Sequence, residues 1–146
     1  MNAILMVLMA MAGLGNDHGI PDNMIQAVTW VESRGSSRAI SSCGARGKMQ
    51  VMWSSVCRGC KTSDPLAKLL HVDAFNRYFG TRILSRWLKR ARRIERGSDS
   101  AAWARALAAF NAGHAGFYGK GPGSGYAMKV LRLVRKGQNR VRIAKK

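Results

Sequence analysis

The chain has 146 residues, of which 25 are Lys or Arg and 7 are Asp or Glu, so its formal net charge is +18. This length suits one domain, which we expect to span residues 1–146. Apolar residues make up 47% of the chain, enough for a buried core, which excludes a disordered basic tail or a histone-like arm. The excess of positive charge predicts an anionic partner: a nucleic acid, a membrane surface or an acidic wall polymer.

Residues 3–14 form an apolar run that is too short to span a bilayer, for which about 20 residues are needed. The run resembles the hydrophobic part of a signal peptide, but no Lys or Arg precedes it, and the first basic residue is Arg34. Gly13 and Gly15 end the run. We expect a buried first helix here, with a cleaved signal peptide as the alternative.

Pro21 and Asp22 mark the start of a helix that we expect to end at Ser33, because Gly35 follows. Residues 34–50 are rich in Ser and Gly and lack helical periodicity. They predict a loop with at most a small β-hairpin.

Apolar residues recur at helical spacing in four later segments, namely residues 66–80, 82–96, 98–111 and 126–135. The second of these carries seven basic residues opposite its apolar positions. Six glycines between positions 113 and 125 predict a mobile loop. We expect the basic residues 137–146 to form a frayed tail. The fold is therefore expected to be mainly α, as one helical domain.

Three cysteines, Cys43, Cys57 and Cys60, admit several uses. The close spacing of the last two suits a metal clamp, with His71 as a further ligand, or a redox pair. A zinc site usually has two such pairs, and a disulfide from Cys43 to either of the others is the alternative in an oxidising compartment. We expect buried thiols, with no metal and no other cofactor.

Glu32 shares the apolar side of the first predicted helix, because Ile25 and Val28 precede it by seven and four positions. A carboxyl at the edge of a core loses hydration, which raises its pKa towards the range where it donates a proton at neutral pH. The alternative is a side chain that turns to solvent or pairs with Arg34 or Arg38. Periodicity leaves both interpretations open.

The residues that follow Glu32 form an ordered set of motifs. The chain reads Glu-Ser, then Ser41, then Gly-Ala-x-Gly-x-Met-Gln ending at Gln50. Residues 109–113 read Ala-Phe-Asn-Ala-Gly, and Gly-Tyr ends at Tyr126. Together with the spacing of Asn76, Gly80 and Leu84, this order resembles the soluble lytic transglycosylase family over about residues 18–135.

The resemblance implies a lysozyme-like α+β fold with a substrate cleft, and peptidoglycan glycan strands as substrate. It implies that Glu32 alone cleaves the β-1,4 bond between N-acetylmuramic acid and N-acetylglucosamine, because the muramoyl 6-hydroxyl closes a 1,6-anhydro ring in place of water. The implied substrate-binding residues are Ser41, Met49, Gln50, Phe110, Asn111 and Tyr126. We expect Asn111 to be a buried amide that faces the cleft.

Two positions depart from the family pattern. Phe110 replaces a Tyr and lacks its hydroxyl, for which Tyr126 is a substitute. Lys48 replaces a Leu and brings a charge close to the cleft. Four other aromatic residues are expected in the core rather than in the site; they are Trp30, Trp53, Phe117 and Tyr118.

The basic face of residues 82–96 and the basic C-terminus are expected to favour anionic envelope polymers or a membrane surface. We expect a monomer that acts at the bacterial cell wall, either periplasmic or extracellular, or associated with a virion or a secretion system. One alternative is a goose-type lysozyme, which needs a second carboxylate from Asp64, Asp73 or Asp99. The others are an inactive wall-binding protein and a nucleic-acid-binding module, which the charge alone supports.

Overall fold

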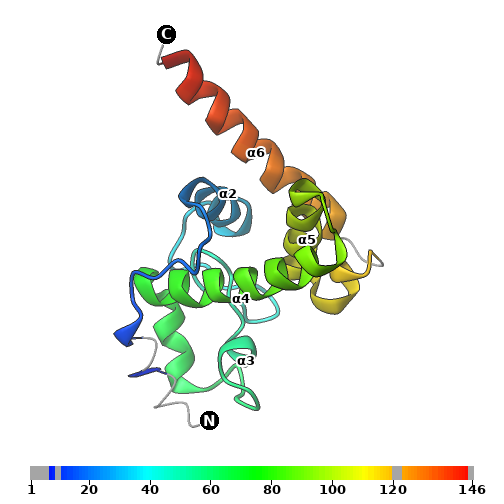
Figure 1. The fold of residues 1–146 in the computed structure, drawn as a ribbon. Helices are drawn as coiled ribbons and strands as arrows, with labels where there is room; N and C mark the ends of the chain where they lie inside the picture. Colours follow the sequence, from blue (N-terminus) through cyan, green and yellow to red (C-terminus); the bar gives the residue numbers. More distant parts are fainter. Residues whose placement is uncertain (1–6, 9–10, 120–122, 145–146) are drawn as a thin grey trace. The chain divides into compact units, whose positions relative to one another are not determined.

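The computed structural model of the chain describes residues 7–8, 11–119 and 123–144, with side chains as far as Gly137. It is mainly helical, as the sequence predicts (Figure 1). In chain order the helices are α2 (Asp22–Ser33), α3 (Trp53–Val56), the 3₁₀ helix η1 (Pro65–His71), α4 (Asp73–Ile94), α5 (Asp99–Phe117) and α6 (Gly123–Ala144). In place of a hairpin, two isolated β-bridges join Ile40 to Arg46 and Arg46 to Val51.

Two compact units make up the chain. The first comprises Met1–Gly19 and Glu32–Ile83, and the second comprises Ile20–Val31 and Leu84–Lys146. The last two residues of α2, all of α3 and η1, and the first half of α4 therefore belong to the first unit.

The second unit is built on closely packed small residues. Ser98 caps α5, because its hydroxyl accepts a 3.2 Å hydrogen bond from the backbone N–H of Ala101. α5 packs against α6. A Cβ added at Gly116 or Gly123 would lie 2.0 or 2.6 Å from the carbonyl oxygen of Ala108. Glycine is needed at both positions because the backbones approach so closely.

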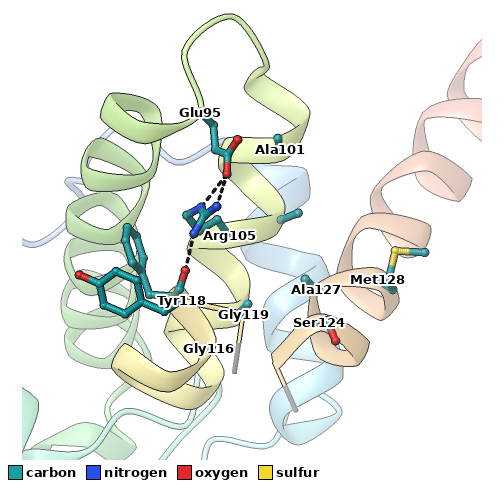
Figure 2. Close-up of a pocket in the computed structure, with 12 residues that line it drawn as sticks. Glu95, Ala101, Arg105, Gly116, Tyr118, Gly119, Ser124, Ala127 and Met128 are labelled. Carbon is teal, nitrogen blue, oxygen red and sulfur yellow. Dashed lines mark hydrogen bonds and ion pairs between the residues drawn. The ribbon is translucent and has the colours of Figure 1, made fainter. Parts of the chain in front are cut away.

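A cavity of about 360 Å³ lies in this unit between α5, α6 and the end of α4 (Figure 2). Arg105 on α5 donates hydrogen bonds to the carboxylate of Glu95 and, at 2.7 Å, to the carbonyl oxygen of Phe117. Both charged side chains are about three-quarters buried. Because they neutralise each other, the polar end of the cavity carries no net charge.

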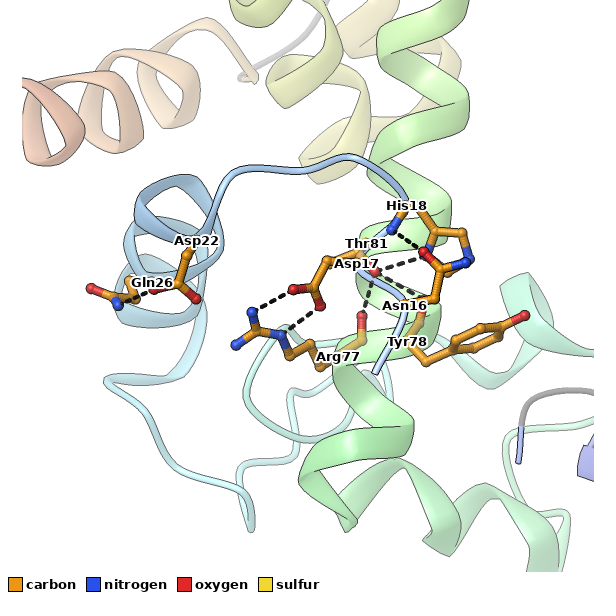
Figure 3. A network of polar contacts seen from close by, with 8 residues as sticks. All are labelled: Asn16, Asp17, His18, Asp22, Gln26, Arg77, Tyr78 and Thr81. Carbon is orange, nitrogen blue, oxygen red and sulfur yellow. Dashed lines mark hydrogen bonds and ion pairs between the residues drawn. The ribbon is translucent and has the colours of Figure 1, made fainter. Parts of the chain in front are cut away.

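In the first unit, a polar network holds the segment before α2 against α4 (Figure 3). Arg77 donates two hydrogen bonds of 2.7 Å to the carboxylate of Asp17. His18 lies beside them, with its Nδ1 3.0 Å from the hydroxyl of Thr81. The hydrogen bonds from Arg77 lower the pKa of the Asp17 carboxyl below its ordinary value.

Replacing Asp17 with Asn is expected to lower the free energy of unfolding at neutral pH by about 0.5 to 1 kcal/mol, since a charged, two-pronged contact is lost. The pKa of Asp17 is lower in the folded chain than its ordinary value of 3.8. Its contribution is therefore fully present above that value and is lost as the pH falls below it. Urea unfolding at several pH values should show a difference between wild type and variant that shrinks only on the acid side. An undiminished difference at strongly acidic pH would contradict this account.

Two of the predicted boundaries around α4 are wrong. The helix expected at residues 66–80 is two helices, because η1 ends at His71 and α4 begins at Asp73. α4 then continues through Gly80 to Ile94. A Cβ at Gly80 would lie 2.5 Å from the sulfur of Met49, so this glycine permits close packing and does not end the helix.

The loop predicted at residues 113–125 is wrong at its two ends, and the expected frayed tail is wrong as far as Ala144. α5 continues past Asn111 to Phe117, with a kink at Gly113, whose φ is 60° and ψ is −141°. α6 begins at Gly123 and runs to Ala144, so the basic tail is helical to that residue. Residues 120–122 of the expected loop lie outside the described residues.

Only part of the apolar segment 3–14 is described. Its residues 7–8 and 11–12 are helical, whereas residues 3–6 and 9–10 lie outside the described residues. Leu8 and Met11 are 57% and 60% exposed, so the expected burial is wrong at these positions. Within the described part of the chain, no helix combines the length and the apolar character needed to cross a membrane.

The state of the three cysteines differs from the one expected. Cys57 and Cys60 form a disulfide, and Cys43 is a free, exposed thiol. The expected free buried thiols and the alternative bridge to Cys43 are therefore both wrong, and the close pair bonds to itself. Among the described residues, no three His, Cys, Asp or Glu side chains gather as a metal site would require.

Candidate functional site

Helix α2 carries Glu32 in its last turn, one residue before the helix ends at Ser33. The side chain is half-buried. Arg34 has a φ of 56° and Gly35 a φ of 84°, so the chain turns sharply away directly after the helix. Glu32 is therefore held at the end of a regular helix rather than on a loop.

Ser33 and Lys48 connect the end of α2 to the loop of residues 39–51, which we call the motif loop. The hydroxyl of Ser33 donates a 2.8 Å hydrogen bond to the backbone carbonyl of Lys48. The side chain of Lys48 pairs with Asp73 in the first turn of α4, at 2.5 Å. The positive charge of Lys48 is therefore paired within the first unit. The sequence did not predict this contact.

Ser41 stabilises a tight turn within the motif loop. Its hydroxyl accepts a 3.0 Å hydrogen bond from the backbone N–H of Ala45, and its own backbone N–H donates to the carbonyl of Ala45 at 2.9 Å. Gly44 in this turn has a φ of 86°, a conformation that favours glycine. The Ser41 hydroxyl is therefore engaged within the loop, and a hydrogen bond from substrate to this hydroxyl would compete with the one from Ala45.

Gln50 ends the motif loop in a strained conformation. Its φ of 48° lies in the left-handed region, which costs a non-glycine residue about 1 kcal/mol or more. The amide Nε2 donates to the carbonyls of Gly47 at 2.9 Å and Ala39 at 3.3 Å. These bonds use the nitrogen, and no hydrogen bond to the amide oxygen is found among the described residues.

Met49 and Asn76 anchor the motif loop in the core of the first unit. Met49 is 1% exposed, as is Asn76 on α4. The amide of Asn76 accepts from the backbone N–H of Met49 at 2.7 Å and donates to the carbonyls of Arg46 at 2.8 Å and Leu70 at 2.9 Å. These bonds use both the oxygen and the nitrogen of a buried amide, so they bind the loop tightly to η1 and α4.

Gly47 allows this close packing. Its φ is 75°, and a Cβ at this position would lie 2.2 Å from the carbonyl oxygen of Leu70 and 2.4 Å from the amide nitrogen of Asn76. Both the backbone conformation and the space therefore require glycine.

The other three predicted site residues belong to the second unit. Phe110 is half-buried and Asn111 is exposed, both on α5 just before the kink at Gly113. Tyr126 on α6 is 8% exposed. The expectation that Asn111 is a buried amide is wrong, because the last turn before the kink projects it from the core.

Of the four aromatic residues expected in the core, two are buried and two are exposed. Trp53 and Phe117 are fully buried, whereas Trp30 and Tyr118 are 50% and 54% exposed. The prediction is therefore confirmed for two of them and wrong for the other two.

Sequence reasoning missed the contacts of Ser33 and Asn76, although both residues stand in the motifs. The signal available for Asn76 was its position between Phe75 and Phe79 on the apolar face of a helix, where an unpaired amide is costly. No local signal identified the partner of Ser33, which lies 15 residues away along the chain.

The three aspartates that a hydrolytic mechanism would draw on make structural contacts. Asp64 caps η1 by accepting from the backbone N–H of Leu66 at 2.9 Å. Asp73 pairs with Lys48, as described above. Asp99 lies in the first turn of α5 and pairs with Arg92 at 3.0 Å.

Comparison with known proteins gives one match. A family model described as Transglycosylase SLT domain matches residues 9–120, which include the motif loop and Asn111. Neither the curated proteins nor the solved structures give a match. The family match confirms the resemblance seen in the sequence, and the helical architecture confirms the expected mainly α, lysozyme-like fold class.

Proposed function

The chain belongs to the Transglycosylase SLT domain family, whose members act on cell wall peptidoglycan, and we propose that it is a lytic transglycosylase with Glu32 as its only acid and base. The observation that carries this proposal is the hydrogen bond from Ser33 to the carbonyl of Lys48. It ties the helix end that bears Glu32 to the motif loop, so Glu32 and the signature residues of that loop belong to one connected part of the first unit.

The position of Glu32 suits a proton donor. The carbonyl groups at the C-terminal end of α2 carry partial negative charge, and Glu32 lies one residue before that end. Partial burial adds to this effect, since both disfavour a charged carboxylate. These are the conditions under which a carboxyl serves as a general acid.

In the proposed reaction, Glu32 protonates the oxygen that links C1 of N-acetylmuramic acid to N-acetylglucosamine, and the C1–O bond breaks. The 6-hydroxyl of the same muramoyl residue then attacks C1 and gives its proton to the Glu32 carboxylate. A 1,6-anhydro ring forms, no water is consumed, and Glu32 ends protonated as it began. Because the nucleophile is part of the substrate, one carboxyl is sufficient.

The remaining site residues enter the proposal with distinct roles. The free amide oxygen of Gln50 is proposed to accept from a sugar group, while Ser41 and Met49 keep the motif loop in shape. Phe110, Asn111 and Tyr126 carry a substrate-binding role from the family resemblance, so their replacement is expected to act mainly on KM.

Mass spectrometry of the muropeptides released from purified peptidoglycan, digested in ¹⁸O-labelled water, tests this mechanism. We expect anhydro-muramoyl ends that are about one water lighter than reducing ends and contain no label. Labelled reducing ends would instead show hydrolysis, as in a goose-type lysozyme. Absence of soluble products would contradict catalysis altogether and would leave wall binding as the function.

A further inference from the structure

We propose that one face of α4 is a docking surface for a linear, phosphate-bearing polymer of the cell envelope. The surface consists of Arg86, Lys89 and Arg93, all in the part of α4 that belongs to the second unit, and we call it the α4 basic stripe. Their spacing of three and four residues places them within an arc of about 60° on the helix. This arc lies opposite the buried Leu84, Leu88 and Ala91.

The charge of the α4 basic stripe is not balanced by carboxylates. Among the residues that the structure describes, none of its three cations forms an ion pair. The other two basic residues of this stretch are already engaged: Arg92 pairs with Asp99, and Arg90 donates to the hydroxyl of Tyr118 at 2.9 Å.

Such a stripe destabilises its own helix, because like charges three and four positions apart repel each other. A solvated surface helix usually interleaves acidic residues, yet α4 contains no acid after Asp73. A bound polyanion would relieve this repulsion. Two of the three residues are arginines, whose planar guanidinium matches a phosphate group with two hydrogen bonds.

The geometry favours a linear polymer over a membrane. Successive cations rise by about 4.5 to 6 Å along one line, so a chain with one phosphate in each short repeat could contact several of them. A membrane-binding helix also needs exposed apolar side chains. The exposed large apolar residue of α4 is Ile94, at the very end of the helix.

Two observations favour a polyol-phosphate polymer over nucleic acid. The stripe itself contains no aromatic side chain on which a base could stack. Peptidoglycan is the family's substrate, so the proposed function brings the protein next to wall polymers. The choice of polymer rests on that function, whereas the existence of the stripe does not.

Binding of poly(glycerol phosphate) to the full chain, measured by titration calorimetry at several salt concentrations, tests the proposal. This probe contains no glycosidic bond, so the result is independent of catalysis. We expect the double variant Arg86→Gln/Arg93→Gln to bind about tenfold more weakly. The slope of log Kd against the logarithm of the salt concentration is expected to decrease by about one and a half, because two phosphate contacts are lost.

The matched control is Arg58→Gln/Lys61→Gln, which removes the same charge from an exposed part of the first unit. It is expected to change Kd by less than about twofold. Equal weakening in both variants would overturn the proposal, because net charge alone would then explain binding. Tighter binding of duplex DNA or of phosphatidylglycerol vesicles than of poly(glycerol phosphate) would overturn the choice of partner.

Thermal unfolding distinguishes docking from a structural role. Since the stripe residues repel each other, Arg86→Gln/Arg93→Gln is expected to leave Tm unchanged or to raise it. A lowered Tm would show that these arginines stabilise the fold, and would count against the proposal. Release of muropeptides from polymer-free peptidoglycan should be the same for this variant as for wild type. Failure of the docking proposal can therefore be distinguished from failure of the transglycosylase mechanism.

Discussion

Replacing Glu32 with Gln is expected to reduce the rate of muropeptide release by about a hundredfold to ten-thousandfold. The amide nearly matches the carboxyl in shape but can neither donate a proton to the leaving oxygen nor take one from the 6-hydroxyl. Tm is measured alongside the rate, so that loss of activity in a folded variant is distinguished from loss of folding. The rate is measured by chromatography of released muropeptides.

The control for this variant is Glu95→Gln, the same chemical change at the other glutamate of the chain. Glu95 is paired with Arg105 and about three-quarters buried, so its replacement is expected to cost about 1 to 3 kcal/mol of unfolding free energy. The rate per folded molecule should be unchanged. Activity retained in folded Glu32→Gln would refute the assignment, and so would equal loss of activity in folded Glu95→Gln.

Replacing Gly47 with Ala is expected to lower the free energy of unfolding by about 3 kcal/mol or more. An alanine at a φ of 75° is strained by itself, and its Cβ would approach the carbonyl oxygen of Leu70 to 2.2 Å. The motif loop must then shift, which breaks the hydrogen bonds made by Asn76. Urea unfolding measures the loss, and muropeptide release is expected to fall with it.

Gly97→Ala is the matched control, because Gly97 has a similar φ of 90° but no atom within 4 Å of the added Cβ. We expect it to cost about 1 kcal/mol, the backbone strain alone. Equal losses in the two variants would show that the packing around Gly47 tolerates a methyl group. The proposed rigidity of the motif loop would then be wrong.

A helix could be predicted from the sequence where proline or glycine marks its two ends. Pro21 and Gly35 predicted the bounds of α2. The ordered motifs identified the family, because their spacing is a property of the chain itself. Fold class and family could therefore be predicted before any contact was known.

The contacts within the motif loop could not be predicted in this way. The sequence indicated that Glu32, Ser41 and Gln50 belong to one signature, but not that Ser33 holds the loop to the helix end through Lys48. The roles of these side chains as acid or substrate contacts stay predictions, and the experiments above test them.

Residue chemistry along the chain thus accounts for the bounds of α2, the mainly helical fold class, the basic stripe and the family. Tertiary packing alone decided the functions of Gly80 and Asn76, and the pairing of Cys57 with Cys60. The physical reason is the range of the interactions. Helix starts, caps and amphipathic periodicity depend on neighbours within a few residues. A close approach or a buried amide depends on atoms far away along the chain, as between Asn76 and Met49, which are 27 positions apart.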